Sequence, residues 1–177
     1  MKSIPKTSRL FFALWPSGSI RQSIVEALSN VTPPVEGNMI PSANLHLTLH
    51  FVGQITEEDK QCMHAAAQSI DVKRFDLKLD CFGCFSRAKI FWMGCSEPVA
   101  GLTTLHQKLA AALESCGYQR EARVYTPHVS LVRKCVRPEI SWGDFSIPWS
   151  VEAFVLVESI SVECGVFYKV IEKYPLF

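Results

Sequence analysis

Two short stretches of the sequence share one pattern: Leu45-His46-Leu47-Thr48-Leu49 and Pro127-His128-Val129-Ser130-Leu131. In each stretch a histidine precedes a hydroxyl residue by two positions, with aliphatic residues between and after them. Successive side chains of a β-strand point to opposite faces, so residues two apart share a face, about 7 Å from one another. The pattern therefore predicts two strands that each present an imidazole beside a hydroxyl on one face and aliphatic side chains to the core on the other.

Brought together, these strands would place two imidazoles and two hydroxyls in one site. Imidazole exchanges protons near neutral pH, and a hydroxyl both donates to and accepts from a phosphoryl oxygen. That set suits acid–base cleavage of a phosphodiester without a metal ion. One such tripeptide is a weak signal because short motifs match by chance, so the pair carries the inference. The alternative for either histidine alone is a hydrogen-bonded residue on an ordinary half-polar sheet.

Length and composition are those of a folded globular protein. A chain of 177 residues suffices for one domain with a sizeable core, and 48% hydrophobic and 20% charged residues exclude a disordered or fibrous class. The formal net charge is +1. An anionic substrate must therefore be held by a local cluster of charge, and tight, salt-sensitive binding to long duplexes is not expected.

The sequence contains no apolar run long enough for a transmembrane helix, so we expect no membrane partner. Lys2, Lys6 and Arg9 precede the apolar residues 10–15, which superficially resembles a secretion signal. That run is short, rich in aromatic residues and interrupted by Pro16, so we interpret it as a strand. The expected compartment is the cytoplasm.

The seven cysteines are scattered and odd in number. Without a secretion signal, this predicts reduced thiols rather than a disulfide scaffold. Cys81-Phe82-Gly83-Cys84 has the spacing of a zinc or redox motif, but there is no second pair, and it follows a strand-like segment at 75–80. We interpret it as a turn with structural cysteines leading into Ser86-Arg87. A zinc or redox protein is the least favoured alternative.

Hydrophobic periodicity and turn residues predict a mixed order of elements. Strands are expected over 9–15, 44–51, 75–80, 89–95, 128–133, 149–160 and 165–171, the last two joined as a hairpin through 163–165. Helices are expected from Ser17 or Ser19, over 56–70, and from Pro98 to Gly117. This order predicts a single α+β domain over 1–177, with two interleaved lobes and a cleft between them.

The two motifs, together with Arg9-Leu10-Phe11-Phe12-Ala13 and Phe51-Val52-Gly53, resemble the 2H phosphoesterases. Within them the chain is most similar to the bacterial RNA 2′,3′-cyclic phosphodiesterases, also described as RNA 2′-5′ ligases. The resemblance extends from Arg9 to the final strands. It implies a bilobal, pseudo-twofold α+β fold, with two antiparallel sheets flanking a central cleft and helices outside. It also implies no metal and no cofactor, and RNA termini or a nucleotide as binding partner. We expect a monomer.

The resemblance implies roles for the motif residues. His46 and His128 match the catalytic histidines, and Thr48 and Ser130 match the hydroxyls that bind phosphate. One neutral histidine would take a proton from water while the other, protonated, delivers one to the leaving ribose oxygen, leaving a 2′-phosphomonoester. The reverse reaction would ligate RNA. The sequence does not distinguish acid from base; we take His128 as the base and His46 as the acid.

Arg133 and Phe51 match two further substrate-binding positions, and Arg133 would stabilise charge on the non-bridging oxygens. Strict alternation points both side chains away from the motif face, so they reach the cleft only if the strands end, twist or bulge before them. Arg133 is the better candidate of the two, and the alternative for Phe51 is a core residue. The same alternation places His50 on the motif face, exposed to solvent.

Two alternatives remain open. One is a 2H phosphodiesterase that acts on a small cyclic nucleotide. The other is a non-hydrolytic nucleotide- or RNA-binding module, which would not need a proton donor–acceptor pair.

Overall fold

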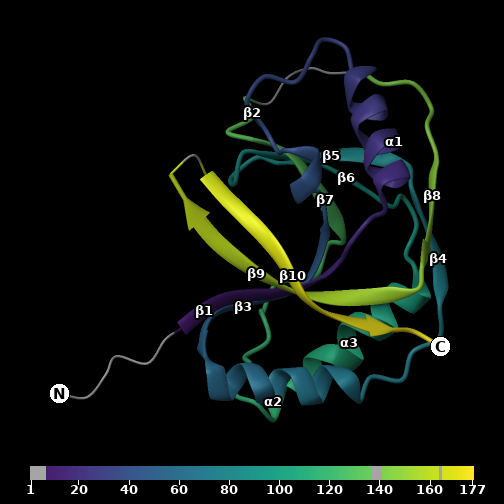
Figure 1. Cartoon of the computed structure of the whole chain (residues 1–177). Helices are drawn as coiled ribbons and strands as arrows, with labels where there is room; N and C mark the ends of the chain where they lie inside the picture. The colour runs from purple at the N-terminus through teal and green to yellow at the C-terminus, as the bar shows by residue number, and fades with distance from the viewer. Residues whose placement is uncertain (1–6, 137–140, 164) are drawn as a thin grey trace.

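The computed structural model describes residues 7–136, 141–163 and 165–177 (Figure 1). It is an α+β fold, as the sequence predicts. The elements in chain order are β1 (Thr7–Leu14), α1 (Gly18–Ser29), β2 (Asn38–Met39), a short 3₁₀ helix (Ser42–Asn44), β3 (Leu47–Thr56), α2 (Glu57–Gln68), β4 (Phe75–Leu79), β5 (Cys81–Phe85), β6 (Ile90–Gly94), α3 (Ala100–Glu114), β7 (His128–Arg133), β8 (Ile147–Val151), β9 (Ala153–Val162) and β10 (Gly165–Pro175).

Eight strands form one antiparallel sheet in the order β10-β9-β1-β3-β7-β6-β5, with β2 paired to β7. Strands β3 and β7 meet at one register pair, Leu47 with Val129. The two predicted sheets are therefore two halves of one sheet, joined where the motif strands meet. Strands β4 and β8 form a separate two-stranded sheet.

The helices lie outside the sheets, as predicted. Figure 1 shows α2 and α3 together at one end of the molecule and α1 at the other, near β8. One core cluster lies under both halves of the long sheet and includes Phe12 of β1, Phe91 of β6 and Phe154 of β9. No helix in the described part of the chain combines the length and the apolar character needed to cross a bilayer.

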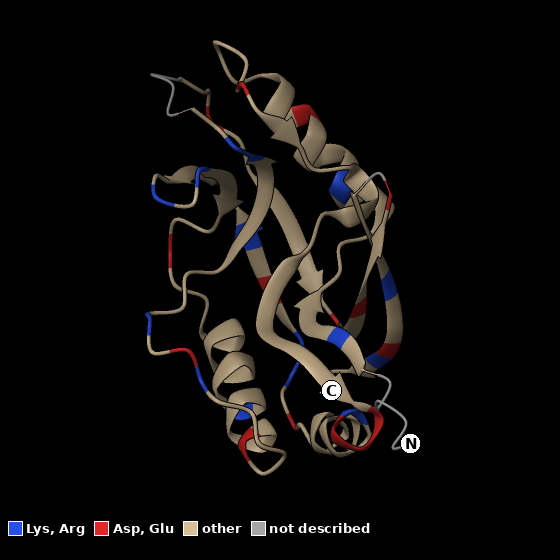
Figure 2. Ribbon diagram, turned by 90° about the vertical axis from the view of Figure 1, so that its left-hand side faces the viewer, with Lys and Arg blue, Asp and Glu red and all other residues tan. Residues whose placement is uncertain are grey.

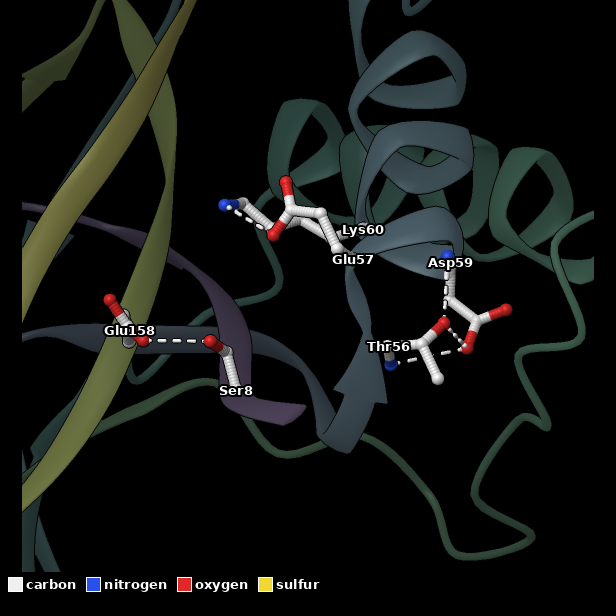
Figure 3. Close-up of polar contacts among 6 residues, drawn as sticks. All are labelled: Ser8, Thr56, Glu57, Asp59, Lys60 and Glu158. Carbon is white, nitrogen blue, oxygen red and sulfur yellow. Dashed lines mark hydrogen bonds and ion pairs between the residues drawn. The ribbon is translucent and has the colours of Figure 1, made fainter. Parts of the chain in front are cut away.

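Helix α2 begins at Thr56, as the sequence predicts, with a reciprocal capping arrangement (Figure 3). The Thr56 hydroxyl accepts from the backbone N–H of Asp59 at 3.2 Å, and the Asp59 carboxylate accepts from the backbone N–H of Thr56 at 3.3 Å. These bonds satisfy donors that the first helical turn leaves free. Helix α1 starts in a related way, since Ser17 rather than Ser19 is its N-cap.

Two strand predictions need correction. The strand expected over 149–160 is two strands separated at Glu152, because β8 pairs with β4 whereas β9 pairs with β1 in the other sheet. The turn expected at Cys81–Cys84 is instead strand β5, and the turn follows it before Ile90. The β9–β10 hairpin is confirmed, with Val162 paired to Gly165.

Gly83 explains the Cys-x-x-C stretch in structural terms. A Cβ atom at Gly83 would lie 2.2 Å from the Trp92 indole, so glycine allows that ring to cross β5. Cys81 and Cys84 are three positions apart in the strand, so their side chains point to opposite faces and do not form a joint ligand pair.

The prediction of reduced thiols is wrong for one pair. Cys62 of α2 and Cys116, just beyond α3, form a disulfide with a Cα–Cα distance of 5.8 Å. The cysteines are 54 positions apart, and the packing of α2 against α3 that brings them together is not visible in their spacing. The free thiols of the described residues are Cys81, Cys84, Cys95 and Cys135, and Cys164 lies outside those residues.

Candidate active site

The two motif strands are neighbours, as the sequence predicts. Strands β3 and β7 run antiparallel, and their paired residues Leu47 and Val129 have no exposed surface. The other aliphatic residues of the two motifs are also buried: Leu45, Leu49 and Leu131. The opposite face of this strand pair is therefore left to the polar motif residues.

The Leu47–Val129 register fixes how the polar residues meet. Continued by one residue in each direction, it sets His46 opposite Ser130 and Thr48 opposite His128. The register thus directs each histidine toward the hydroxyl of the other motif, and the charge of His128 is one of the effects that lower the pKa of His46.

Both histidine rings are oriented by the same local bond. Nδ1 of His46 lies 2.7 Å from the carbonyl oxygen of Asn44, and Nδ1 of His128 lies 2.7 Å from that of Thr126. A carbonyl oxygen only accepts, so Nδ1 carries the hydrogen in each ring. This assigns the tautomer and leaves Nε2 of both rings for proton exchange with a ligand.

His46 is surrounded by aromatic rings. Its ring centre lies 4.8 Å from Phe11, 5.7 Å from the nearly parallel Trp15 and 5.2 Å from Tyr168, which meets it edge-on. Burial lowers the pKa of His46 to about 4, against the opposing effect of its bond to the Asn44 carbonyl. The positive charge of Arg133 contributes to the lowering. His46 is therefore neutral in the free protein at neutral pH.

His128 has a different environment. It packs edge-on against Phe85 at 4.8 Å and lies 6.1 Å from Trp92. Burial lowers its pKa, the bond to the Thr126 carbonyl opposes this effect, and the charge of Arg123 adds to the lowering. The two imidazoles therefore respond to different arginines.

A cavity of about 210 Å³ lies against the motif face. The predicted residues His46, Thr48, Ser130, Arg133 and Phe51 all line it. His128 is not among its lining residues, and the strand register alone places it across from Thr48.

A bulge in β3 turns Phe51 toward the cavity. The register with β1 passes from Thr48 to His50 and skips Leu49. Leu49 and His50 are consecutive and both buried, so alternation resumes with Phe51 on the cavity side, where 42% of its surface is exposed. Strict alternation is therefore wrong for His50, which points into the core rather than into solvent.

A second bulge does the same for Arg133. The register of β7 with β6 passes from Ser130 to Val132 and skips Leu131. Leu131 and Val132 are both buried, and Arg133 emerges on the cavity side at the end of the strand. The condition that the sequence set for Arg133 and Phe51, a bulge before each, is met in both strands.

The sequence matches the family model of the 2′-5′ RNA ligase superfamily over residues 16–160. The chain belongs to this superfamily. It is 33% identical to the RNA 2′,3′-cyclic phosphodiesterase of Escherichia coli, covering 71% of each chain. It is 30% identical to the enzyme of that name from Thermus thermophilus, covering 95% of this chain and 90% of the relative. Its fold superposes on the crystal structure of E. coli LigT complexed with 3′-AMP with a TM-score of 0.88 and 28% identity, covering 97% of this chain and 99% of that one.

Behind the site of this 2′-5′ RNA ligase superfamily protein lies a buried network that sequence reasoning missed. Nε2 of His50 donates to the carbonyl of His106 at 2.8 Å, and its Nδ1 accepts from the Tyr118 hydroxyl at 3.0 Å. The His106 ring stacks on Tyr125 at 3.8 Å, and the Tyr125 hydroxyl donates to the carbonyl of Thr48 at 2.9 Å. Tyr125 thus links the segment before the second motif to the first motif strand.

Metal-ligating side chains do not cluster in the described part of this superfamily member: no three His, Cys, Asp or Glu residues gather there as a possible ion site. The cavity beside the motifs is lined by no carboxylate of the described chain. The groups that it offers to a ligand are imidazole, hydroxyl, amide and guanidinium.

Proposed function

We propose that the protein hydrolyses 2′,3′-cyclic phosphate ends of RNA or of nucleosides to 2′-phosphomonoesters, by acid–base catalysis with two histidines. The observation that carries this proposal is the arrangement of the motif strands. Two imidazoles with free Nε2 atoms alternate with two hydroxyls across one strand pair. The relatives named RNA 2′,3′-cyclic phosphodiesterase support the same activity.

Phosphate binding falls to the groups around the histidines. Thr48 and Ser130 present hydroxyls to the cavity, and Arg133, the last residue of β7, presents a guanidinium to it. Their hydrogen bonds to the non-bridging oxygens stabilise the charge that builds up as water adds to phosphorus. Phe51 offers an exposed aromatic face on which a nucleobase can stack.

In the chemical step, Nε2 of His128 removes a proton from water as the water oxygen bonds to phosphorus. The bond from phosphorus to O3′ breaks, and protonated Nε2 of His46 gives its proton to O3′. The phosphate stays on O2′. A ribose 5′-hydroxyl in place of water gives a 2′-5′ linkage by the same proton movements, which is the ligation that we propose as a second outcome at this site.

The charges around His46 support its assignment as the acid. Arg133 contributes to the low pKa of His46, whereas Arg123 acts on His128. A bound phosphodiester anion at Arg133 opposes that charge and raises the pKa of His46 selectively. Substrate binding therefore favours the proton on His46 and leaves His128 neutral as the base.

We also propose that residues 1–177 act as one domain and as a monomer, in the cytoplasm, where RNA is processed. One core cluster packs under both halves of the sheet, and every group in the proposed mechanism comes from a single chain.

The test is incubation with a nucleoside 2′,3′-cyclic phosphate in the presence of EDTA, with the products followed by phosphorus NMR. The expected result is a 2′-phosphomonoester only. A 3′-phosphomonoester would contradict the assigned leaving group. Saturable binding without turnover would indicate a binding module instead.

A further inference from the structure

The cavity beside the motifs contains more positive charge than a terminal cyclic phosphate requires. A 2′,3′-cyclic phosphate carries one negative charge. The lining residues include two arginines, Arg133 and Arg9, and no carboxylate. Arg133 and the two motif hydroxyls already suffice for the terminal phosphate. The charge of Arg9 is therefore left for another group of the substrate.

Arg9 lies farther along the sheet than the motif residues. Its guanidinium carbon is 5.0 Å from the ring centre of Phe51. Phe51 pairs with Phe11, and Thr48 pairs with Ala13, two residues further along β1. Two residues of a strand span about 7 Å. Phe51, whose ring carries the Arg9 guanidinium, is thus displaced from Thr48 along the sheet by roughly that distance, on the scale of one nucleotide step.

Within the part of the chain that the structure describes, the donors of Arg9 are available to a ligand. Arg9 takes part in no ion pair among the described residues, whose ion-paired cations are Lys60, Arg74, Lys78, Arg120 and Arg123. The carboxylate of Glu158 on the neighbouring strand accepts from the Ser8 hydroxyl at 2.8 Å, as Figure 3 shows. A planar guanidinium held on an aromatic ring with unused donors is well suited to bind a phosphate.

We propose that Arg9 binds the phosphodiester on the 5′ side of the terminal nucleotide, so that the protein recognises the end of an oligonucleotide in preference to a mononucleotide. This inference rests on the proposed function and specifies its substrate. Ser159 and Tyr168 of the β9–β10 hairpin line the same cavity as Arg9 and the motif residues.

The proposed contact with RNA involves only two phosphates at the end of the chain. The basic residues Arg120 and Arg123 lie outside the cavity lining and pair with Glu114 and Glu121. In Figure 2, Lys and Arg are scattered along the ribbon and separated by other residues, with no continuous basic face in that view. Two phosphates held by Arg133 and Arg9 give affinity that falls only gently with salt.

The test compares kcat/KM for three substrates that share the terminal nucleoside 2′,3′-cyclic phosphate. They are the mononucleotide, the dinucleotide, and the dinucleotide with an uncharged methylphosphonate linkage between its nucleosides. The wild-type protein should prefer the charged dinucleotide over the uncharged one roughly tenfold, the gain expected from one charge-assisted hydrogen bond. In Arg9→Gln this ratio should fall to about one, and Arg9→Lys should keep part of it.

Arg74→Gln serves as the matched control, because Arg74 pairs with Glu152 and is absent from the cavity lining. It should retain the wild-type ratio. A wild-type ratio near one, or an undiminished ratio in Arg9→Gln, would overturn the proposal for Arg9 alone. Absence of turnover with all three substrates would refute the proposed function and this inference together.

Discussion

Replacing Arg133 with glutamine should raise the pKa of His46 in the free protein. Burial is the main cause of the low His46 pKa, and the Arg133 charge is an added cause. Glutamine removes the charge, keeps similar bulk and leaves the burial unchanged. The pKa of His46 should therefore rise from about 4 but stay below the 6.5 of an unperturbed histidine.

The effect is measurable because His46 begins far from its ordinary value. At pH 6, a pKa of about 4 leaves His46 about 1% protonated, whereas an unperturbed histidine would be about 76% protonated. A titration of the imidazole proton resonances by NMR from pH 3.5 to 8 reads the pKa directly. The kinetic counterpart is the pH profile of kcat/KM, whose two limbs report the ionisations of the coupled histidine pair in the free enzyme.

Arg123→Gln is the matched control, since Arg123 lowers the pKa of His128. That variant should move the titration of His128 more than that of His46, whereas Arg133→Gln should do the reverse. A wild-type His46 that titrates at 6.5 or above would refute the reasoning, and so would an Arg133→Gln variant that leaves the His46 pKa unchanged.

Three further predictions concern the framework of the site. Gly83→Ala should lower the free energy of unfolding by about 1–3 kcal/mol in chemical denaturation, because the new methyl group overpacks against Trp92; unchanged stability would exclude that clash. Tyr125→Phe should lower kcat by a larger factor than it changes KM, because it removes the hydrogen bond from the Tyr125 hydroxyl to the Thr48 carbonyl. Wild-type kcat in this variant would show that the hydrogen bond is dispensable. Burial lowers the pKa of His106 to about 4, so the unfolded chain binds a proton between pH 6.5 and 4 that the folded chain does not. Stability should therefore fall as pH drops through that window, and less steeply in His106→Phe; parallel urea-unfolding curves for both proteins would contradict this.

The sequence was most informative where periodicity alone determines structure. The paired motifs predicted two strands with Leu47 and Val129 toward the core, and that is the arrangement found. The capping residue Thr56 marked the start of α2 because its hydroxyl and the Asp59 carboxylate act within four residues. Interactions of this kind join residues close in the sequence and can therefore be predicted from the sequence alone.

The errors arose where distant segments decide the outcome. The bulges at Leu49 and Leu131 exist in relation to β1 and β6, so alternation within one strand gave the wrong face for His50. The Cys62–Cys116 disulfide depends on the packing of α2 against α3. Arg9 was visible in principle, since alternation along β1 places it on the same face as Phe11.

The most direct test of the two-histidine mechanism is the turnover of His46→Ala and His128→Ala on a nucleoside 2′,3′-cyclic phosphate. Each variant should lower kcat at least about 10²-fold, the low end of the contribution of a general acid or base. Both proteins should still fold, because neither histidine belongs to the main core cluster under the long sheet, and circular dichroism checks the fold of each variant. Near-wild-type turnover in either folded variant would contradict the mechanism.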